Sequence, residues 1–352
     1  MFGTYLPEDV TILLKDITGL VEPLSTEERE RRIQNGMHYS EMLPIEYKPT
    51  ADYLDIYNLS LKAFSDITAE AVGNVSRKIL ADKGKDVVLV SLARAGTPIG
   101  ILIKRYLKQF FDVSPEHYSI SIIRGVGIDP VAMQFILDRH DGKQIQFIDG
   151  WTGKGAIQNE LNKAMEAYST VDPGLAVLSD PANIAKISGT NEDFLIASSC
   201  LNATVSGLLS RTFNRNDIIK PGDFHGAVFY KELIPEDVTY QFIDTIVSHF
   251  KAPDEIGNSN PIIGNNYKGI DEAKDICNEF GIDDINLVKP SIGETTRVLL
   301  RRVPWKVLVY SLDDEKNLGH IYQLAREKNV PVELYPLRLY KACGLIKSMA
   351  DQ

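Results

Sequence analysis

Residues 87–250 contain two patterns of apolar and polar positions. Short apolar runs predict buried strands, and the longer amphipathic stretches between them predict helices. The expected strands are 87–92, 118–123, 145–148, 175–178, 194–197 and 227–230, and the expected helices are 55–81, 98–110, 130–140, 154–168, 202–212 and 235–250. Strands that alternate with helices in this way are typical of a parallel, doubly wound α/β sheet.

A second, smaller pattern follows a polar segment at 251–260, whose Pro, Gly and Asn residues predict a linker. Beyond it the alternation resumes and predicts a compact α/β/α layer. The expected helices are 269–280, 293–302, 315–328 and 337–348, and the expected strands are 285–288, 305–310 and 332–335. We therefore predict two domains, at 1–250 (with a helical extension over about 1–85) and at 261–352.

The loop after the strand at 145–148 carries candidate chemistry. The strand ends at Asp149, and a glycine-containing loop leads into a helix near Ala156. Bare amides at a helix N-terminus bind phosphate, and a carboxylate there can hold ribose hydroxyls or a magnesium ion. An ordinary strand–turn–helix with glycine for geometry is the alternative. The loop residues assigned to substrate binding are Thr152, Gly153, Lys154 and Gly155.

Two further loops carry arginines at predicted strand ends. Arg94 lies between small residues, so the backbone can approach an anion while the guanidinium contacts it. Arg124, beside two glycines, predicts a mobile cationic flap that closes over the ligand. A surface arginine and a plain hinge are the respective alternatives. The residues after Arg94 that are assigned to substrate binding are Ala95, Gly96 and Thr97.

Polar residues gather at the start of the predicted helix 293–302. Amides and cations there could hold phosphates of a folded RNA, and a glutamate could accept base N–H groups. A solvated helix face with a Glu at its dipole-favoured start is the alternative. The candidate RNA-binding residues are Lys289, Gly293, Glu294, Thr296, Arg297 and Arg301.

Cys200 is a candidate nucleophile, because it lies between a predicted strand and a predicted helix whose dipole would lower a thiol pKa. His225, with Asp223 nearby, would be its base. A small buried cysteine packed at the strand end is the alternative. Cys277 and Cys343 are expected in the core, on helices of the second domain.

Composition narrows the function classes. A hydrophobic content of 44% and a charged content of 24% are ordinary for a globular protein, and the net charge of −10 disfavours a chain-wide nucleic-acid coat. The three cysteines have no metal-binding spacing and indicate a reducing compartment. The N-terminal residues do not resemble a signal peptide, and no apolar run is long enough to span a membrane. We therefore expect a cytoplasmic protein.

The first domain resembles the type I phosphoribosyltransferases. The resemblance rests on the order of the loop 93–96, Arg124, and Asp149 followed by Thr152 and Gly153, with Gly150 where the family has a second acidic residue. It is closest to a divergent branch of bacterial tellurite-resistance and stress gene clusters, some members of which carry a cysteine-protease label. In the second domain, Gly293, Glu294, Thr296, Arg297 and Arg301, followed by 307–310, Asp313, 329–332 and Gly344, resemble the pelota class that binds kink-turn RNA.

The resemblance implies a phosphoribosyltransferase that acts on 5-phosphoribosyl pyrophosphate (PRPP) or a related ribose phosphate with magnesium. It implies that loop 93–97 holds the pyrophosphate, that Arg124 closes over it, and that Asp149 holds ribose or magnesium. Structured RNA is the expected partner of the second domain, and a homodimer is an expected assembly. A cysteine hydrolase using Cys200 and His225 and a non-catalytic ribose-phosphate sensor remain the alternative functions.

Overall fold

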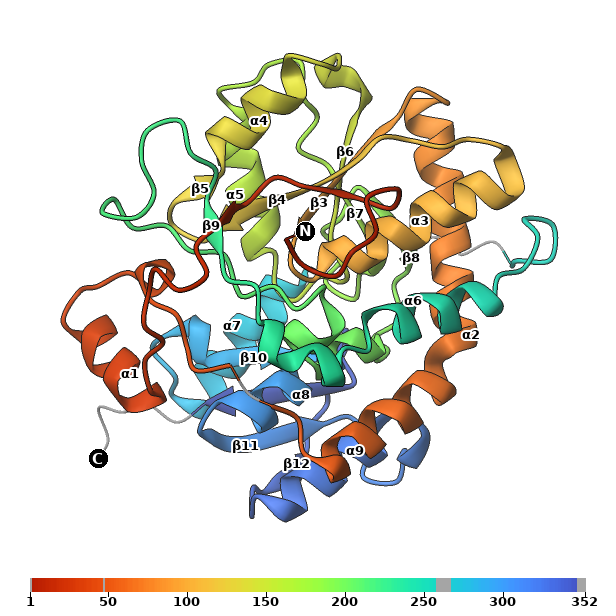
Figure 1. Ribbon diagram of the computed structural model, residues 1–352. Coiled ribbons are helices and arrows are strands. Elements are labelled where there is room, and N and C mark those ends of the chain that lie inside the picture. Colours follow the sequence, from red (N-terminus) through yellow and green to blue (C-terminus); the bar gives the residue numbers. More distant parts are fainter. Residues whose placement is uncertain (1, 47, 258–266, 347–352) are drawn as a thin grey trace.

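The computed structural model describes residues 2–46, 48–257 and 267–346 and contains two main sheets (Figure 1). The larger sheet has the order β1-β4-β3-β6-β7-β8, and its neighbours all pair in parallel. A short β5 adds to β4 in the antiparallel direction. Its strands are β1 (Thr11–Ile12), β3 (Val88–Ala93), β4 (His117–Ile123), β5 (Gly127–Ile128), β6 (Ile145–Ile148), β7 (Leu175–Ser179) and β8 (Ile187–Thr190). The predicted parallel α/β sheet is confirmed.

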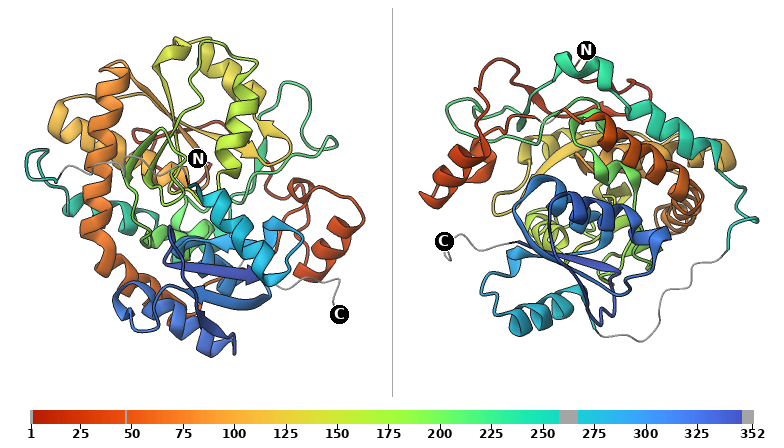
Figure 2. Two further views of the ribbon diagram at one scale, coloured as in Figure 1. Left: turned by 180° about the vertical axis from the view of Figure 1, so that it is seen from behind. Right: turned by 90° about the horizontal axis from the view of Figure 1, so that it is seen from below.

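Helices cover both faces of this sheet, as the two further views show (Figure 2). One core contains apolar residues of α2, α3 and α6, and a second core contains those of α4 and α5. Strand β3 serves both, because Leu89 faces the first core while Val88 and Val90 face the second. The helices are α2 (Ala51–Lys83), α3 (Gly96–Phe111), α4 (Pro130–Leu137), α5 (Ala156–Met165) and α6 (Thr239–Ser248).

The segments outside these layers are short. A strand of the N-terminal region pairs in parallel with a short strand at residues 226–227, and a helix follows the N-terminal strand in the chain. These are β2 (Lys15–Asp16), β9 (Gly226–Ala227) and α1 (Thr26–Gln34), and the 3₁₀ helices are η1 (Tyr39–Glu41), η2 (Gly142–Gln144), η3 (Ala197–Cys200), η4 (Ala203–Val205), η5 (Lys231–Glu236) and η6 (Ile285–Leu287). Among the described residues, no helix combines the length and apolarity that crossing a membrane would require.

The strand predicted at 194–197 and the helix predicted at 202–212 are wrong. Only the turns η3 and η4 form there, because Gly207 and Leu208 both have left-handed backbone angles that end any helix. The Ser206 hydroxyl donates to the carbonyl of Asn202, which is the local side-chain competition expected of a Ser- and Asn-rich stretch. The strand at β8, which the sequence analysis did not predict, completes the sheet instead.

The smaller sheet has the order β10-β13-β11-β12. Its strands are β10 (Val288–Pro290), β11 (Pro304–Val309), β12 (Val332–Leu334) and β13 (Ala342–Ile346), and its helices are α7 (Gly269–Phe280), α8 (Ile292–Arg301) and α9 (Glu315–Glu327). The helix predicted at 337–348 is wrong: β13 is a fully buried strand between β10 and β11, and it carries Cys343. A short, wholly apolar run cannot be assigned to helix or strand by periodicity alone.

The second domain packs against the carboxyl ends of the large sheet. Asp193, which is 3% exposed, accepts backbone N–H groups from Ile292 and Lys341 of the second domain. The Tyr340 hydroxyl donates to the carbonyl of Gly153 at 2.5 Å. The predicted linker at 251–260 lies partly outside the described residues, since these omit 258–266. These contacts place α8 directly over the loops that carry the candidate chemistry.

Candidate functional site

Two adjoining cavities of about 150 and 320 Å³ lie at the carboxyl ends of β3 and β6, and we call them together the central cavity. They share Ala95, Asp149, Ile157 and Arg297 among their lining residues. The ionisable side chains that line them are the basic Arg94, Arg124, Lys154, Arg211, Lys289 and Arg297 and the acidic Asp149 and Glu294. A chain with a net charge of −10 therefore has a strongly basic cavity.

A group of arginines forms one wall of the central cavity. The pKa of Arg211 is lowered to about 10, mainly by burial and in addition by repulsion from Arg29, Arg94 and Arg124. The Tyr39 ring lies 4.5 Å from the Arg211 guanidinium carbon, a favourable cation–π contact. Guanidiniums that depress one another's pKa in this way favour a multivalent anion between them.

Arg94 is partly committed to the protein itself. Its guanidinium donates to the carbonyl of Leu209 at 3.0 Å and to Asn202 Oδ1 at 3.3 Å, and it lies 4.0 Å from the Glu46 carboxylate. These contacts fix the orientation of the group, and its remaining N–H donors can bind a ligand. The predicted anion-binding role of Arg94 stays a prediction.

The neighbours of Arg94 have mainly structural contacts. Thr97 is buried, and its hydroxyl shares a 2.7 Å hydrogen bond with Ser119. Gly96 begins α3, and a Cβ there would lie 2.3 Å from the carbonyl oxygen of Ile148. Glycine at 96 therefore allows the helix to start against β6, and only Ala95 of the three lines the central cavity.

Asp149 projects from the end of β6 toward the second domain. Burial raises the pKa of its carboxyl to about 6; the Gly150 N–H and Arg297 oppose this shift, and Glu294 adds to it. Both Arg297 and Glu294 come from α8, so the second domain tunes a carboxyl of the first. A carboxyl with a pKa near 6 can accept or release a proton near neutral pH.

The loop after Asp149 is held by the protein more than the sequence analysis predicted. The Thr152 N–H donates to the carbonyl of Ser179, and its hydroxyl donates to Asp180 Oδ1 at 2.5 Å. Lys154 Nζ donates to the carbonyls of Ile285 and Val288, and burial lowers its pKa to about 8. Thr152 and Lys154 therefore act as structural and interdomain contacts here, although both line the cavity.

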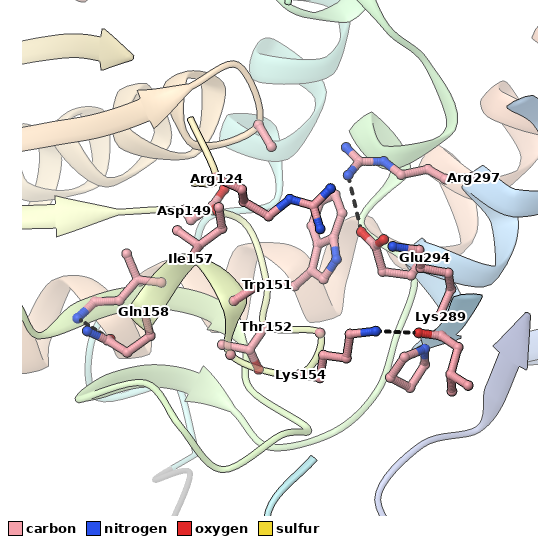
Figure 3. A pocket seen from close by; sticks show the side chains of 17 residues that line it. Arg124, Asp149, Trp151, Thr152, Lys154, Ile157, Gln158, Lys289, Glu294 and Arg297 are labelled. Carbon is pink, nitrogen blue, oxygen red and sulfur yellow. Dashed lines mark hydrogen bonds and ion pairs between the residues drawn. The ribbon is translucent and has the colours of Figure 1, made fainter. Parts of the chain in front are cut away.

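The predicted flap at 124–129 is a turn between β4 and β5. The Arg124 N–H donates to the Tyr39 hydroxyl, its carbonyl contacts His38 Nε2, and the Gly125 N–H donates to Glu160 Oε1. The backbone of this turn is therefore anchored, while residues 124–126 are exposed. Figure 3 shows the Arg124 side chain extending into the cavity.

Two of the residues assigned to RNA binding, Arg297 and Gly293, face Trp151 of the first domain, and the side chain of Arg301 lies outside the described part of the chain. The Arg297 guanidinium carbon lies 4.4 Å from the centroid of the Trp151 ring, and its NH1 lies 3.3 Å from Glu294 Oε1 (Figure 3). Thr296 is fully buried and bonds to His320, and a Cβ at Gly293 would lie 3.3 Å from Trp151. RNA contact through these positions would require the two domains to separate.

Cys200 and His225 lie in different surroundings. Cys200 is 2% exposed, and its carbonyl accepts a hydrogen bond from the Tyr53 hydroxyl. Burial raises the pKa of the nearby Tyr57, and the Cys200 thiol adds to this shift. His225 Nδ1 instead bonds to Ser121 Oγ at 2.8 Å beside a separate cavity of about 990 Å³. The predicted base is therefore engaged elsewhere, and the structure does not bring this pair together.

Arg211, Tyr39 and Trp151 line the central cavity but were not predicted from the sequence. Arg211 falls in the segment wrongly predicted as a helix, and Tyr39 falls in the predicted N-terminal extension, so neither was assigned to the cavity. Trp151 stands inside the Asp149 loop and could have been found as an aromatic next to a candidate site. Among the described residues, no group of three or more His, Cys, Asp or Glu side chains could hold a metal, so magnesium at Asp149 stays a prediction.

Comparison with known proteins gives two family matches. A family model described as "Tellurite-like stress resistance cysteine protease StiP" matches residues 3–247, and one described as "PELOTA RNA binding domain" matches residues 267–348. The "Cysteine protease StiP" of Acinetobacter baylyi is 34% identical over 99% of this chain and 94% of its own length. The predicted resemblance to the tellurite-stress branch and to the pelota class is confirmed.

Similar solved structures include phosphoribosyltransferases. A hypoxanthine-guanine phosphoribosyltransferase of Bacillus anthracis has a TM-score of 0.27 and 13% identity, over 36% of this chain and 77% of its own. A hypoxanthine phosphoribosyltransferase of Trypanosoma cruzi has a TM-score of 0.29 and 16% identity, over 50% and 85% of the two chains. The predicted phosphoribosyltransferase activity is wrong, because the relative and the family that match by sequence are named as cysteine proteases.

Proposed function

Because the chain belongs to the family of tellurite-like stress resistance cysteine proteases StiP, we propose that it is a thiol-dependent hydrolase whose nucleophile is Cys200. One observation carries this assignment: Cys200 is the only cysteine within the matched residues 3–247. Cys277 and Cys343 both belong to the second domain, where burial raises the pKa of each thiol.

The surroundings of Cys200 support a position next to a substrate site. Its neighbours Ser198, Leu201 and Asn202 line the central cavity, on the wall that also carries Arg94. A thiolate that attacks a peptide carbonyl forms a carbon–sulfur bond, and the carbon–nitrogen bond then breaks as the amine leaves with a proton. Water hydrolyses the resulting thioester and returns the thiol. The basic cavity would hold an acidic part of the substrate.

The buried state of Cys200 requires the thiol to become accessible before it can react. The surrounding turns η3 and η4 are single 3₁₀ turns, which are easier to rearrange than a regular helix. In the resting protein the thiol should therefore alkylate slowly. Because His225 is engaged by Ser121, we expect another group to accept the proton of the Cys200 thiol. The Asp149 carboxyl has a suitable pKa of about 6.

The test compares matched cysteine variants in the hydrolysis of fluorescein-labelled casein. We expect Cys200→Ala to abolish hydrolysis and Cys277→Ala, a half-buried cysteine of the second domain, to retain it. Thermal melting of both variants controls for folding, since a small buried cysteine replaced by alanine should cost only about 1 kcal/mol. Equal hydrolysis by Cys200→Ala, or no hydrolysis by the unaltered protein, would overturn the proposal.

A second candidate function is ligand binding without transfer chemistry. The arginine group around Arg211 favours it, because such a group fits the phosphates of PRPP or another phosphorylated ribose. A magnesium ion would then be held by Asp149 together with phosphate oxygens, as is usual where the protein offers one carboxylate. Calorimetric titration with PRPP, with and without magnesium, tests this candidate, and heat that is absent in both titrations would exclude it.

A further inference from the structure

The central cavity is built from both domains. The first domain contributes Arg94, Arg211 and Asp149, and the second contributes Lys289, Glu294 and Arg297. Because Arg297 lines both adjoining cavities, it stands where they meet. Figure 3 shows Arg124 and Arg297 reaching into this space from opposite sides. A ligand long enough to extend from Arg94 past Arg297 would contact both domains at once.

The charges contributed by the second domain are only partly matched. The Arg297 Nε is buried and has no hydrogen-bond partner among the described residues. Burial lowers the pKa of Lys289, and repulsion from Arg124 and Arg302 adds to this, while Glu294 opposes it. A buried donor without a partner and a lysine repelled by arginines both gain from an anion, since it supplies the missing acceptor and the missing charge.

We infer that the second domain completes a composite site for an elongated, multivalent anion, with Arg297 as a ligand-binding residue rather than a surface RNA contact. The anion would carry phosphate or carboxylate groups, one end between Arg94 and Arg211 and the other beside Arg297 and Lys289. This inference deepens the anion-binding candidate above and does not depend on whether Cys200 is a nucleophile.

The contacts between the two domains favour a ligand-binding role for Arg297 over a role in packing alone. The interface is fixed elsewhere, by Asp193 with Ile292 and Lys341 and by Tyr340 with Gly153. Arg297 is therefore one of several contacts between the domains. It contacts the Trp151 ring and Glu294, which both line the same cavity.

The two tryptophans of the chain allow a direct test. In a Trp305→Phe background, Trp151 is the only tryptophan, and it lies in the composite site. Titration with sodium tripolyphosphate, and separately with citrate, distinguishes phosphate from carboxylate ligands. We expect saturable changes in Trp151 emission with at least one of them. Arg297→Ala should weaken that binding at least tenfold, measured also by calorimetry because this substitution alters the surroundings of Trp151.

The control is Arg326→Ala, which removes an exposed cation of the same domain and should leave the affinity unchanged. Arg297→Lys keeps the charge and should recover part of the affinity, which a merely structural role would not predict. Equal binding by the unaltered protein and Arg297→Ala would overturn the composite site alone. Absence of binding of both anions to the unaltered protein would overturn the anion-binding candidate as well.

Discussion

The central cavity and the cavity beside His225 differ in how their polar groups are satisfied. Beside His225, the fully buried Asp129 accepts the N–H groups of Val131, Ala132 and His225, and Lys15 pairs with Asp223 at 2.6 Å. In the central cavity, the arginines repel one another and the pKa of Asp149 is raised to about 6. The cavity beside His225 is nevertheless the more spacious, at about 990 Å³.

This difference separates structural polar groups from groups available to a ligand. A buried polar group whose hydrogen bonds are met within the chain stabilises the fold, whereas unmatched like charges lower stability unless something binds them. By this criterion the central cavity is the better candidate for ligand binding, although it is smaller. The ring of His225 is engaged by Ser121, and its predicted catalytic role stays a prediction.

The largest expected effect concerns Asp193, which joins the two domains that form the central cavity. Burial raises its pKa from 3.8 to about 7, although three backbone N–H groups, of Lys341, Ile292 and Ala342, oppose the shift. Between pH 4 and 7 the unfolded chain has lost this proton while the folded chain retains it. The free energy of unfolding should therefore fall by about 1.4 kcal/mol for each unit by which the pH rises within this range.

Urea denaturation at several pH values measures the free energy of unfolding of the unaltered protein and of Asp193→Asn. The difference between the two profiles should change between pH 4 and 7 and be constant above pH 7. A constant difference over the whole range would show that Asp193 is ionised in the folded protein.

The next effect concerns Asp129, beside His225. Asp129→Ala should lower the free energy of unfolding by about 3 kcal/mol, because it leaves three backbone N–H groups without their acceptor. The affinity of the folded variant for tripolyphosphate should stay unchanged. Chemical denaturation and calorimetry measure the two quantities, and a loss of affinity in the folded variant would contradict the structural assignment of this region.

A smaller effect is expected at Arg94 in the central cavity. Arg94→Ala should weaken tripolyphosphate binding by about 2 kcal/mol, roughly 30-fold, because a charge-assisted contact is lost. Lys163→Ala is the matched control, since Lys163 is an exposed cation lining the cavity beside His225. Calorimetry should show no change for the control, and similar losses in both variants would mean that only net charge matters.

The smallest effect is expected for His225→Gln. If His225 does not serve Cys200, the rate at which iodoacetamide alkylates Cys200 should remain within about twofold of the unaltered rate, since the thiolate fraction is unchanged. Mass spectrometry of the peptide containing Cys200 measures the rate. A large decrease would restore the pairing predicted from sequence and would place the two regions in one site.

Periodicity was sufficient to predict the parallel sheet and the covering helices. The apolar runs of β3, β4 and β6 are buried on both faces, which produces a strong local signal. The segment 194–212 and the strand β13 were predicted wrongly, because the left-handed backbone at Leu208 and the pairing of β13 between two strands depend on distant residues.

The charged loops at the carboxyl edge of the sheet could be identified from the sequence, because parallel strands bring their ends to the same edge. Asp149 and Arg94 were found in this way, and both line the central cavity, whereas Arg297 was predicted as an RNA contact of the second domain. The surroundings of these residues could not be predicted and follow from the packing of the chain. His225 bonds to Ser121 and not to Cys200, Arg211 lies among the arginines of the cavity, and Arg297 packs on Trp151. These positions depend on how the two domains pack and on which hydrogen-bond partners each buried group has.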